Sequence, residues 1–184
     1  MKVVERALNG LIVFKPTVFS DDRGLFFESY SESVILGEIG HENSFVQDNH
    51  SVSKKNVVRG LHFQAPPHAQ GKLVRVVNGA ALDVAVDIRL GSPTYGKAFT
   101  VELNAVNNYI FWIPPGFAHG FSSLKEETVF LYKCTAMYHK ASEGTILFND
   151  TELNIDWKVK NPIVSEKDLQ GTVFNSFKSP FVYR

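Results

Sequence analysis

The sequence predicts an all-β jelly roll, a sandwich or barrel of strands, with one short helix and an irregular C-terminal segment. About nine short apolar or alternating runs recur along the 184 residues, and such runs are typical of strands. Turn residues such as Asn78-Gly79 stand between them, and only one segment has helical periodicity, so β-α-β units are not expected. Fifteen Phe, six Tyr and two Trp favour strands around a wide aromatic interior.

The expected elements follow in order along the chain. Strands are predicted at residues 11–14, 25–30, 45–47, 72–77, 80–88, 98–103, 109–113, 128–134 and 144–148. A helix is predicted at 31–41, because a Ser-x-Ser start precedes Val34, Ile35 and Ile39 at helical spacing and a glycine stands near its end. From residue 149 onward the alternation is lost, so this last part is expected to cover the barrel as a mostly irregular segment.

Length and composition limit the class of protein. A chain of 184 residues fits one domain, residues 1–184, with a sizeable core. Nineteen basic residues balance nineteen acidic ones, so neither a nucleic-acid partner nor a membrane surface is expected. The single Cys134 forms no internal disulfide, and no apolar run fits a signal sequence or a membrane span, so a cytoplasmic location is expected.

Polar and titratable residues concentrate in one stretch of this otherwise apolar chain: Gln47, Asn49, His50, Arg59, His62, Gln64, His68, Gln70 and Lys72. On a strand, Gln47 and Asn49 share a face and could line a pocket, although a solvated face explains the pair equally well. Arg59 and His62 lie three apart, so a regular strand sends them to opposite faces unless Gly60 marks a bulge. A single His on a strand is more often structural than catalytic. A catalytic role for His62 therefore requires partner residues.

Two further side chains are expected to point inward. Lys72 shares a strand face with Val74 and Val76, which would place its ammonium beside apolar neighbours; a surface lysine with a buried stem is the alternative. Tyr132 shares a face with Phe130 and Cys134, and a buried Tyr is more often a core residue than a catalyst. Its phenol, with an ordinary pKa of about 10, is still a plausible acid toward an enolate, which is a strong base.

A metal site is not expected. His62 and His119 suggest one, since many jelly-roll enzymes bind metals through clustered His and Glu. Such enzymes carry two His one residue apart on one strand, whereas Gln64 stands where the second ligand would lie. Glycine-rich phosphate loops are absent as well, so phosphates would be bound by side chains such as Arg23 and Arg59.

Seven strings in order resemble the dTDP-4-dehydrorhamnose 3,5-epimerase family, over about residues 3 to 170. They are Asp22-Arg-Gly24, Phe45-Val-Gln-Asp-Asn-His50, Val58-Arg-Gly-Leu-His-Phe-Gln64, Gln70-Gly-Lys72, Asp83-Val-Ala-Val-Asp-Ile-Arg89, Trp112-Ile-Pro-Pro-Gly-Phe-Ala-His-Gly120 and Asn154-Ile-Asp-Trp157. The resemblance implies a metal-free, cofactor-free cupin jelly roll, a homodimer, and a 6-deoxy-4-ketohexose linked to thymidine diphosphate as substrate. The implied reaction inverts C3 and C5 of that sugar, in dTDP-rhamnose biosynthesis.

The resemblance also implies roles for single residues. His62 matches the family's base, Asp168 the carboxylate that orients it, Tyr132 the acid, and Lys72 the cation near the sugar's C4 oxygen. Substrate-binding positions match Arg23, Glu28, Gln47, Asn49, Arg59, Lys72, His119, Glu143 and Lys167, and the aromatic that stacks on the nucleobase matches Tyr138. These residue types suit removal of a proton next to a ketone, which needs both a base and a group that stabilises the enolate.

Three other functions remain compatible with the strings. An epimerase that inverts only C3 or only C5 shares much of the framework, and the presence of both His62 and Tyr132 favours double inversion over it. A non-catalytic cupin that binds a sugar nucleotide would have lost one of these two residues. A metal-dependent cupin oxygenase or isomerase would contain a bound transition metal.

Overall fold

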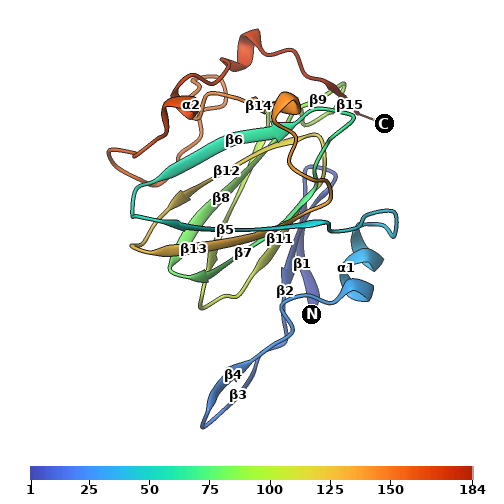
Figure 1. The fold of residues 1–184 in the computed structure, drawn as a ribbon, viewed down its shortest axis with the longest axis vertical. Helices are drawn as coiled ribbons and strands as arrows, with labels where there is room; N and C mark the ends of the chain where they lie inside the picture. Colours follow the sequence, from blue (N-terminus) through green and yellow to red (C-terminus); the bar gives the residue numbers. More distant parts are fainter. Residues whose placement is uncertain (184) are drawn as a thin grey trace.

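Two facing antiparallel sheets form the body of the protein, which the computed structural model describes for residues 1–183 (Figure 1). One sheet has six strands, in the spatial order β1 (Lys2–Ala7), β2 (Leu11–Lys15), β11 (Ile110–Ile113), β7 (Lys72–Asn78), β13 (Thr128–Cys134) and β5 (Gln47–Ser53). The other has five, in the order β10 (Ala98–Asn104), β8 (Ala80–Asp87), β12 (Phe117–Ser123), β6 (Val58–Gln64) and β14 (Glu143–Thr145). The predicted all-β jelly roll is confirmed.

Short elements complete the described part of the chain. Two-stranded pairs are formed by β3 (Phe19–Asp21) with β4 (Gly24–Phe26) and by β9 (Arg89–Leu90) with β15 (Phe181–Val182). The helices are α1 (Glu32–Ile39) and the single turn α2 (Glu166–Leu169), with short 3-10 turns at Lys140–Ser142 and Phe174–Ser176. The predicted helix is thus confirmed, although Ser31 at its N-cap position makes no side-chain capping bond.

The two sheets pack face to face, and further segments pack on their outer faces. Between them lies a core that includes the fully buried Val74, Phe111 and Phe130. Helix α1 packs Ile35 on the outer face of the six-stranded sheet. Residues 149–183 cover the outer face of the five-stranded sheet, as the orange and red ribbon shows, and bury Trp157 there (Figure 1). Every residue of the central strand β8 is therefore buried.

The segment from residue 149 is mostly irregular, as predicted, and specific hydrogen bonds order its backbone. The indole N–H of Trp157 donates to the Phe148 carbonyl at 2.7 Å. The buried carboxylate of Asp150 accepts from the backbone N–H of Phe174 at 2.8 Å and of Glu152 at 2.9 Å. These bonds satisfy buried polar groups of a non-repetitive backbone. The segment carries α2, whose Asp168 contacts Gly60 and His62 of strand β6.

Several predicted boundaries were wrong. The strand expected at 25–30 ends at Phe26, and the strand expected at 45–47 runs instead over Gln47–Ser53. The strands Lys2–Ala7, Val58–Gln64 and Phe117–Ser123 were not predicted. The last of these is buried at every position, so its sequence lacks the apolar-polar alternation of a half-exposed strand.

Candidate active site

A β-bulge on β6 brings Arg59 and His62 to the same cavity. His62 lies opposite His119 and Arg59 lies opposite Phe121, so three steps on β6 match two on β12. Gly60 makes this possible: its φ is +117°, and a Cβ there would lie 2.6 Å from the Cα of Gly120. The possibility of a bulge at Gly60, which the sequence spacing left open, is confirmed.

Asp168 orients the imidazole of His62. Nε2 of His62 lies 2.6 Å from Oδ1 of Asp168, and Oδ2 accepts from the backbone N–H of Gly60 at 3.2 Å. Burial raises the pKa of Asp168, but the hydrogen bond and charge of His62 and the Gly60 N–H outweigh it and keep the pKa below its ordinary value. The carboxylate therefore stays ionised and holds the proton of His62 on Nε2, which leaves Nδ1 as the free basic nitrogen.

Lys72 points between the two sheets, as its strand face predicts. Its neighbours on that face, Val74 and Val76, are buried in the inter-sheet core. Burial lowers the pKa of the Lys72 ammonium, and the nearby Cys134, Asp83 and Glu143 counter this effect. The result is a poorly solvated cation that interacts strongly with a negative oxygen placed beside it.

Tyr132 faces the same interior from β13. Burial raises the pKa of its phenol, while the positive charge of Arg59 acts in the opposite direction. The Lys72 ammonium lies 6.0 Å from its ring centroid. Asn49, opposite Tyr132 on β5, donates to Cys134 Sγ at 3.5 Å and accepts from Gln47 Nε2 at 3.0 Å. Gln47 and Asn49 therefore lie on the inner face of β5 and not on a solvated face.

Two adjoining cavities, of about 530 and 300 Å³, collect these side chains. His62, Lys72, Tyr132 and Glu143 line both of them. The larger cavity adds Arg59, His119, Lys167 and Asp168, and the smaller one adds Gln47, Asn49 and Tyr138. Of the thirteen residues expected from the sequence, only Arg23 and Glu28 line neither cavity.

Three residues form a network at the rim of these cavities. Lys167 Nζ lies 2.5 Å from Glu143 Oε1, and the Tyr138 hydroxyl donates to Glu143 Oε2 at 3.0 Å. Burial raises the pKa of Glu143, but the hydrogen bonds from Lys167 and Tyr138 prevail and lower it. The network connects α2 to β14 and to the loop that carries Tyr138.

Arg23 lies far from this cluster. It belongs to the turn of the β3–β4 hairpin, which extends away from the sandwich (Figure 1). Its side chain is 91% exposed and pairs with Asp21 at 2.5 Å. Glu28 follows directly after the hairpin. Within one copy of residues 1–183, the structure therefore does not bring these two expected binding residues to the site.

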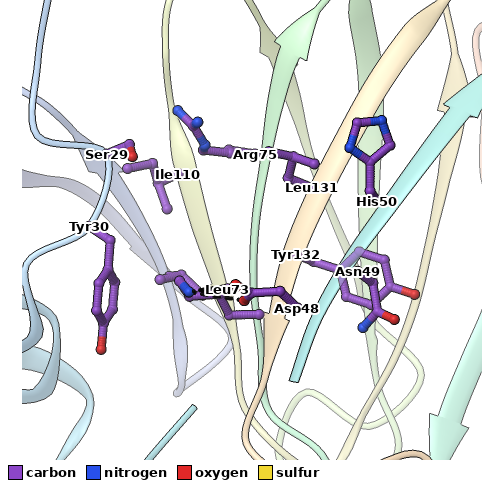
Figure 2. A pocket seen from close by; sticks show the side chains of 11 residues that line it. Ser29, Tyr30, Asp48, Asn49, His50, Leu73, Arg75, Ile110, Leu131 and Tyr132 are labelled. Atoms are coloured by element: carbon purple, nitrogen blue, oxygen red, sulfur yellow. Dashed lines mark hydrogen bonds and ion pairs between the residues drawn. The ribbon is translucent and has the colours of Figure 1, made fainter. Parts of the chain in front are cut away.

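A third hollow, of about 360 Å³, lies on the opposite face of the six-stranded sheet (Figure 2). Tyr30 stands on one side of it and His50 on the other, with the Arg75 guanidinium between them. Burial lowers the pKa of Arg75. This hollow contains none of the His62, Lys72 or Asp168 side chains.

Sequence reasoning missed three groups that support the site. Gly60 supplies a backbone donor to Asp168, and the Ser165 hydroxyl accepts from the backbone N–H of Asp168 at 3.2 Å and so caps α2. Asp83 is fully buried and contacts His119. The sequence marks Gly60 only as a possible bulge, whereas Asp83 leaves a usable signal, because alternation along 80–88 places it on one face with two small residues, Ala81 and Ala85.

Within residues 1–183, no group of three or more His, Cys, Asp or Glu side chains is arranged to hold a metal ion. No helix in that range has the length and apolar character needed to cross a membrane.

Fold and cavity together place the chain among jelly-roll proteins equipped to move protons on a bound small molecule. Residues 5–176 match the sequence model of the dTDP-4-dehydrorhamnose 3,5-epimerase family. The chain belongs to this family and is an epimerase.

Individual relatives agree along nearly the whole chain. The dTDP-4-dehydrorhamnose 3,5-epimerase of Pseudomonas aeruginosa is 51% identical over 175 residues, which are 95% of this chain and 96% of the relative. That of Shigella flexneri is 49% identical over 174 residues, again 95% and 96% of the two chains. The crystal structure of dTDP-6-deoxy-D-glucose-3,5-epimerase from Legionella pneumophila in complex with dTDP-4-keto-L-rhamnose superposes with a TM-score of 0.94 at 41% identity. The superposition covers 100% of this chain and 98% of the Legionella chain.

Proposed function

We propose that the chain inverts C3 and C5 of dTDP-4-keto-6-deoxy-D-glucose and so forms dTDP-4-keto-L-rhamnose. The observation that carries the proposal is the 2.6 Å contact between His62 and Asp168 at a cavity that Lys72 and Tyr132 also line. Relatives named for this reaction extend over nearly the whole chain, which supports the same substrate class.

In the proposed reaction, His62 takes the proton from a carbon next to the C4 ketone. The electron pair of the broken C–H bond passes into the ring and onto the C4 oxygen, which gives an enolate and an imidazolium. Asp168 stabilises that imidazolium through Nε2, and Lys72 stabilises the enolate oxygen. Both partners act on charge that exists only after the proton has moved, which is the condition for catalysis.

Inversion requires a proton from the other face of the sugar. Tyr132 projects from β13 in the six-stranded sheet, whereas His62 projects from β6 in the five-stranded sheet, so the two groups approach the cavity from different sheets. The phenol gives its proton to the carbanionic carbon, and exchange with solvent resets both groups. C3 and C5 are both adjacent to C4, so one set of residues serves both carbons.

The remaining cavity residues hold the rest of the substrate. Arg59 and Lys167 provide positive charge for the diphosphate, and Tyr138, which is 55% exposed at the rim, stacks on thymine. The other binding residues are Gln47, Asn49, His119 and Glu143.

The active form in this proposal is a homodimer in which each β3–β4 hairpin reaches the second copy. Phe19 is 63% exposed and Phe26 is 69% exposed on that hairpin, an apolar surface that a lone copy leaves in water. Val52 on strand β5 is exposed as well. A second copy that covers these residues brings Arg23 and Glu28 to a substrate site that one copy leaves without them.

Deuterium exchange tests the reaction. The protein is incubated with dTDP-4-keto-6-deoxy-D-glucose in deuterated water, and the label is located by NMR. Label at both C3 and C5 supports the double epimerase, whereas label at one carbon assigns a single-position epimerase. Absence of label at both carbons refutes the proposal. His62→Ala should abolish exchange and leave dTDP binding within about tenfold, because the base contributes to the transition state rather than to nucleotide binding.

Complementation tests the dimer. His62→Ala and Arg23→Ala copies should each be impaired, but a co-refolded mixture should recover about a quarter of wild-type activity. Half of the dimers would be mixed, and each would contain one complete site. If Arg23 served its own copy, mixing would restore nothing.

A further inference from the structure

The larger cavity contains a second histidine–carboxylate pair, formed by His119 and Asp83. Nε2 of His119 lies 3.0 Å from Oδ1 and 3.1 Å from Oδ2 of Asp83. The two side chains come from neighbouring strands, β12 and β8, and are 7% and 0% exposed. Asp83 is therefore a buried carboxyl group, and both of its oxygens contact the same imidazole nitrogen.

Burial favours the neutral form of the His119 ring. Burial lowers the pKa of His119, and the nearby Lys72 and His62 lower it further, although Asp83 acts against this. A neutral imidazole has one N–H and one lone pair. A carboxylate accepts hydrogen bonds only, so the N–H faces Asp83 and the lone pair remains on Nδ1.

We infer that Asp83 is a positioning residue that fixes His119 as the Nε2–H tautomer, so that Nδ1 accepts a hydrogen bond from a hydroxyl of the sugar ring. The inference rests on the proposed function, since the larger cavity is taken as the sugar site. Nδ1 makes no hydrogen bond within residues 1–183, and His119 lines the cavity beside His62 and Lys72. Asp83 would thus recognise a hydroxyl without touching it.

The hydroxyl belongs to C2 or C3, because the substrate has a ketone at C4 and no oxygen at C6. An acceptor in a dry cavity discriminates strongly for a hydroxyl donor, since an analogue that lacks the hydroxyl leaves the acceptor unpaired. In the other tautomer, Nδ1 would carry the proton. It would then donate to the oxygen of the hydroxyl instead of accepting the hydroxyl's hydrogen. Substrate specificity would then depend on where one proton lies.

NMR tests the tautomer directly. Long-range ¹H–¹⁵N spectra of the full chain distinguish the protonated ring nitrogen, and a His119→Gln variant assigns the signal. The wild-type protein should have Nε2 protonated and Nδ1 unprotonated near pH 7.5. Asp83→Asn should mix or reverse this pattern, because an amide can donate to Nε2. A wild-type spectrum with Nδ1 protonated would overturn the inference, even if the protein exchanges no deuterium at all.

Kinetics test the hydroxyl. Asp83→Asn should lower kcat/KM for C5 exchange by about tenfold or more on the full substrate, a loss typical of one misplaced buried hydrogen bond. On the 2-deoxy or the 3-deoxy analogue the penalty should nearly vanish, and the analogue on which it vanishes identifies the hydroxyl. Equal losses on all three substrates would mean a purely structural role, and no loss on any would mean no role; both outcomes overturn the inference. The thermal midpoint and dTDP affinity report whether the variant is folded.

Discussion

Nε2 of His62 lies 2.6 Å from Oδ1 of Asp168, although 106 positions separate the two residues in sequence. One comes from a strand in the middle of a sheet and the other from a single helical turn in the segment that covers that sheet. The contact has consequences for both stability and activity, because the pKa of Asp168 is lower in the folded protein than in the unfolded chain.

Asp168 should make stability depend on acid pH. A carboxyl group whose folded pKa is depressed stabilises the fold above its unfolded pKa of about 3.9, and this contribution is lost as the pH falls through the folded pKa. Urea unfolding should therefore show a smaller free energy of unfolding for Asp168→Asn than for wild type at pH 7, with the two curves converging below about pH 4. A constant difference from pH 7 to pH 3 would contradict this assignment.

Lys72 should set the alkaline limit of activity. Burial lowers the pKa of its ammonium, so the positive charge near the enolate should be lost below the ordinary lysine pKa of about 10.4. Lys72→Met should reduce exchange by about 100- to 1,000-fold, as expected for loss of one group that stabilises an oxyanion. Lys72→Arg, if active, should lack the alkaline decline. A wild-type profile that stays flat to pH 10.5 would refute the assignment.

Tyr138 should contribute its ring rather than its hydroxyl to nucleotide binding. Tyr138→Ala should weaken dTDP binding by about tenfold, the loss of one stacking contact. Tyr138→Phe removes only the hydrogen bond to Glu143, which is exposed, and should change the Kd less than threefold. Isothermal titration calorimetry measures both values. Equal losses in the two variants would assign the effect to the rim network instead.

Gly60 should tolerate no side chain. Gly60→Ala places a Cβ 2.6 Å from the Gly120 Cα at a φ of +117°, which should cost about 1–3 kcal/mol and shift the N–H that holds Asp168. Gly37→Ala is the matched control, because nothing lies within 4 Å of its Cβ and it belongs to helix α1. It should stabilise the protein by about 0.5–1 kcal/mol. Chemical unfolding and exchange rates distinguish the two.

The inward faces were predictable where a strand is regular. The two-residue alternation of strand side chains correctly predicted that Lys72 and Tyr132 point to the interior. Their strands, β7 and β13, lie in one sheet that packs on an apolar core. At Gly60 the same rule left two possibilities, a regular strand or a bulge. A bulge depends on how closely the Gly120 backbone approaches. Local periodicity contains no information about that neighbouring strand.

Contacts between distant segments were beyond the reach of periodicity. Asp168 lies on one helical turn in a segment without alternation, so only family resemblance indicated it. The resemblance also indicated Arg23, whose hairpin leaves it 91% exposed in a single copy. Strand patterns predict which side chains share a face, but not where a hairpin that extends away from both sheets places its side chains.

The cover over the five-stranded sheet has a consequence for heat inactivation. Residues 149–183 carry Asp168 and are ordered by local bonds such as those of Asp150 and Trp157, while His62 belongs to the sheet beneath. A segment with few strand contacts opens more readily than a sheet. Detachment of this cover would separate carboxylate from imidazole while both sheets remain intact, so the enzyme would lose turnover at a lower temperature than it loses its β-structure.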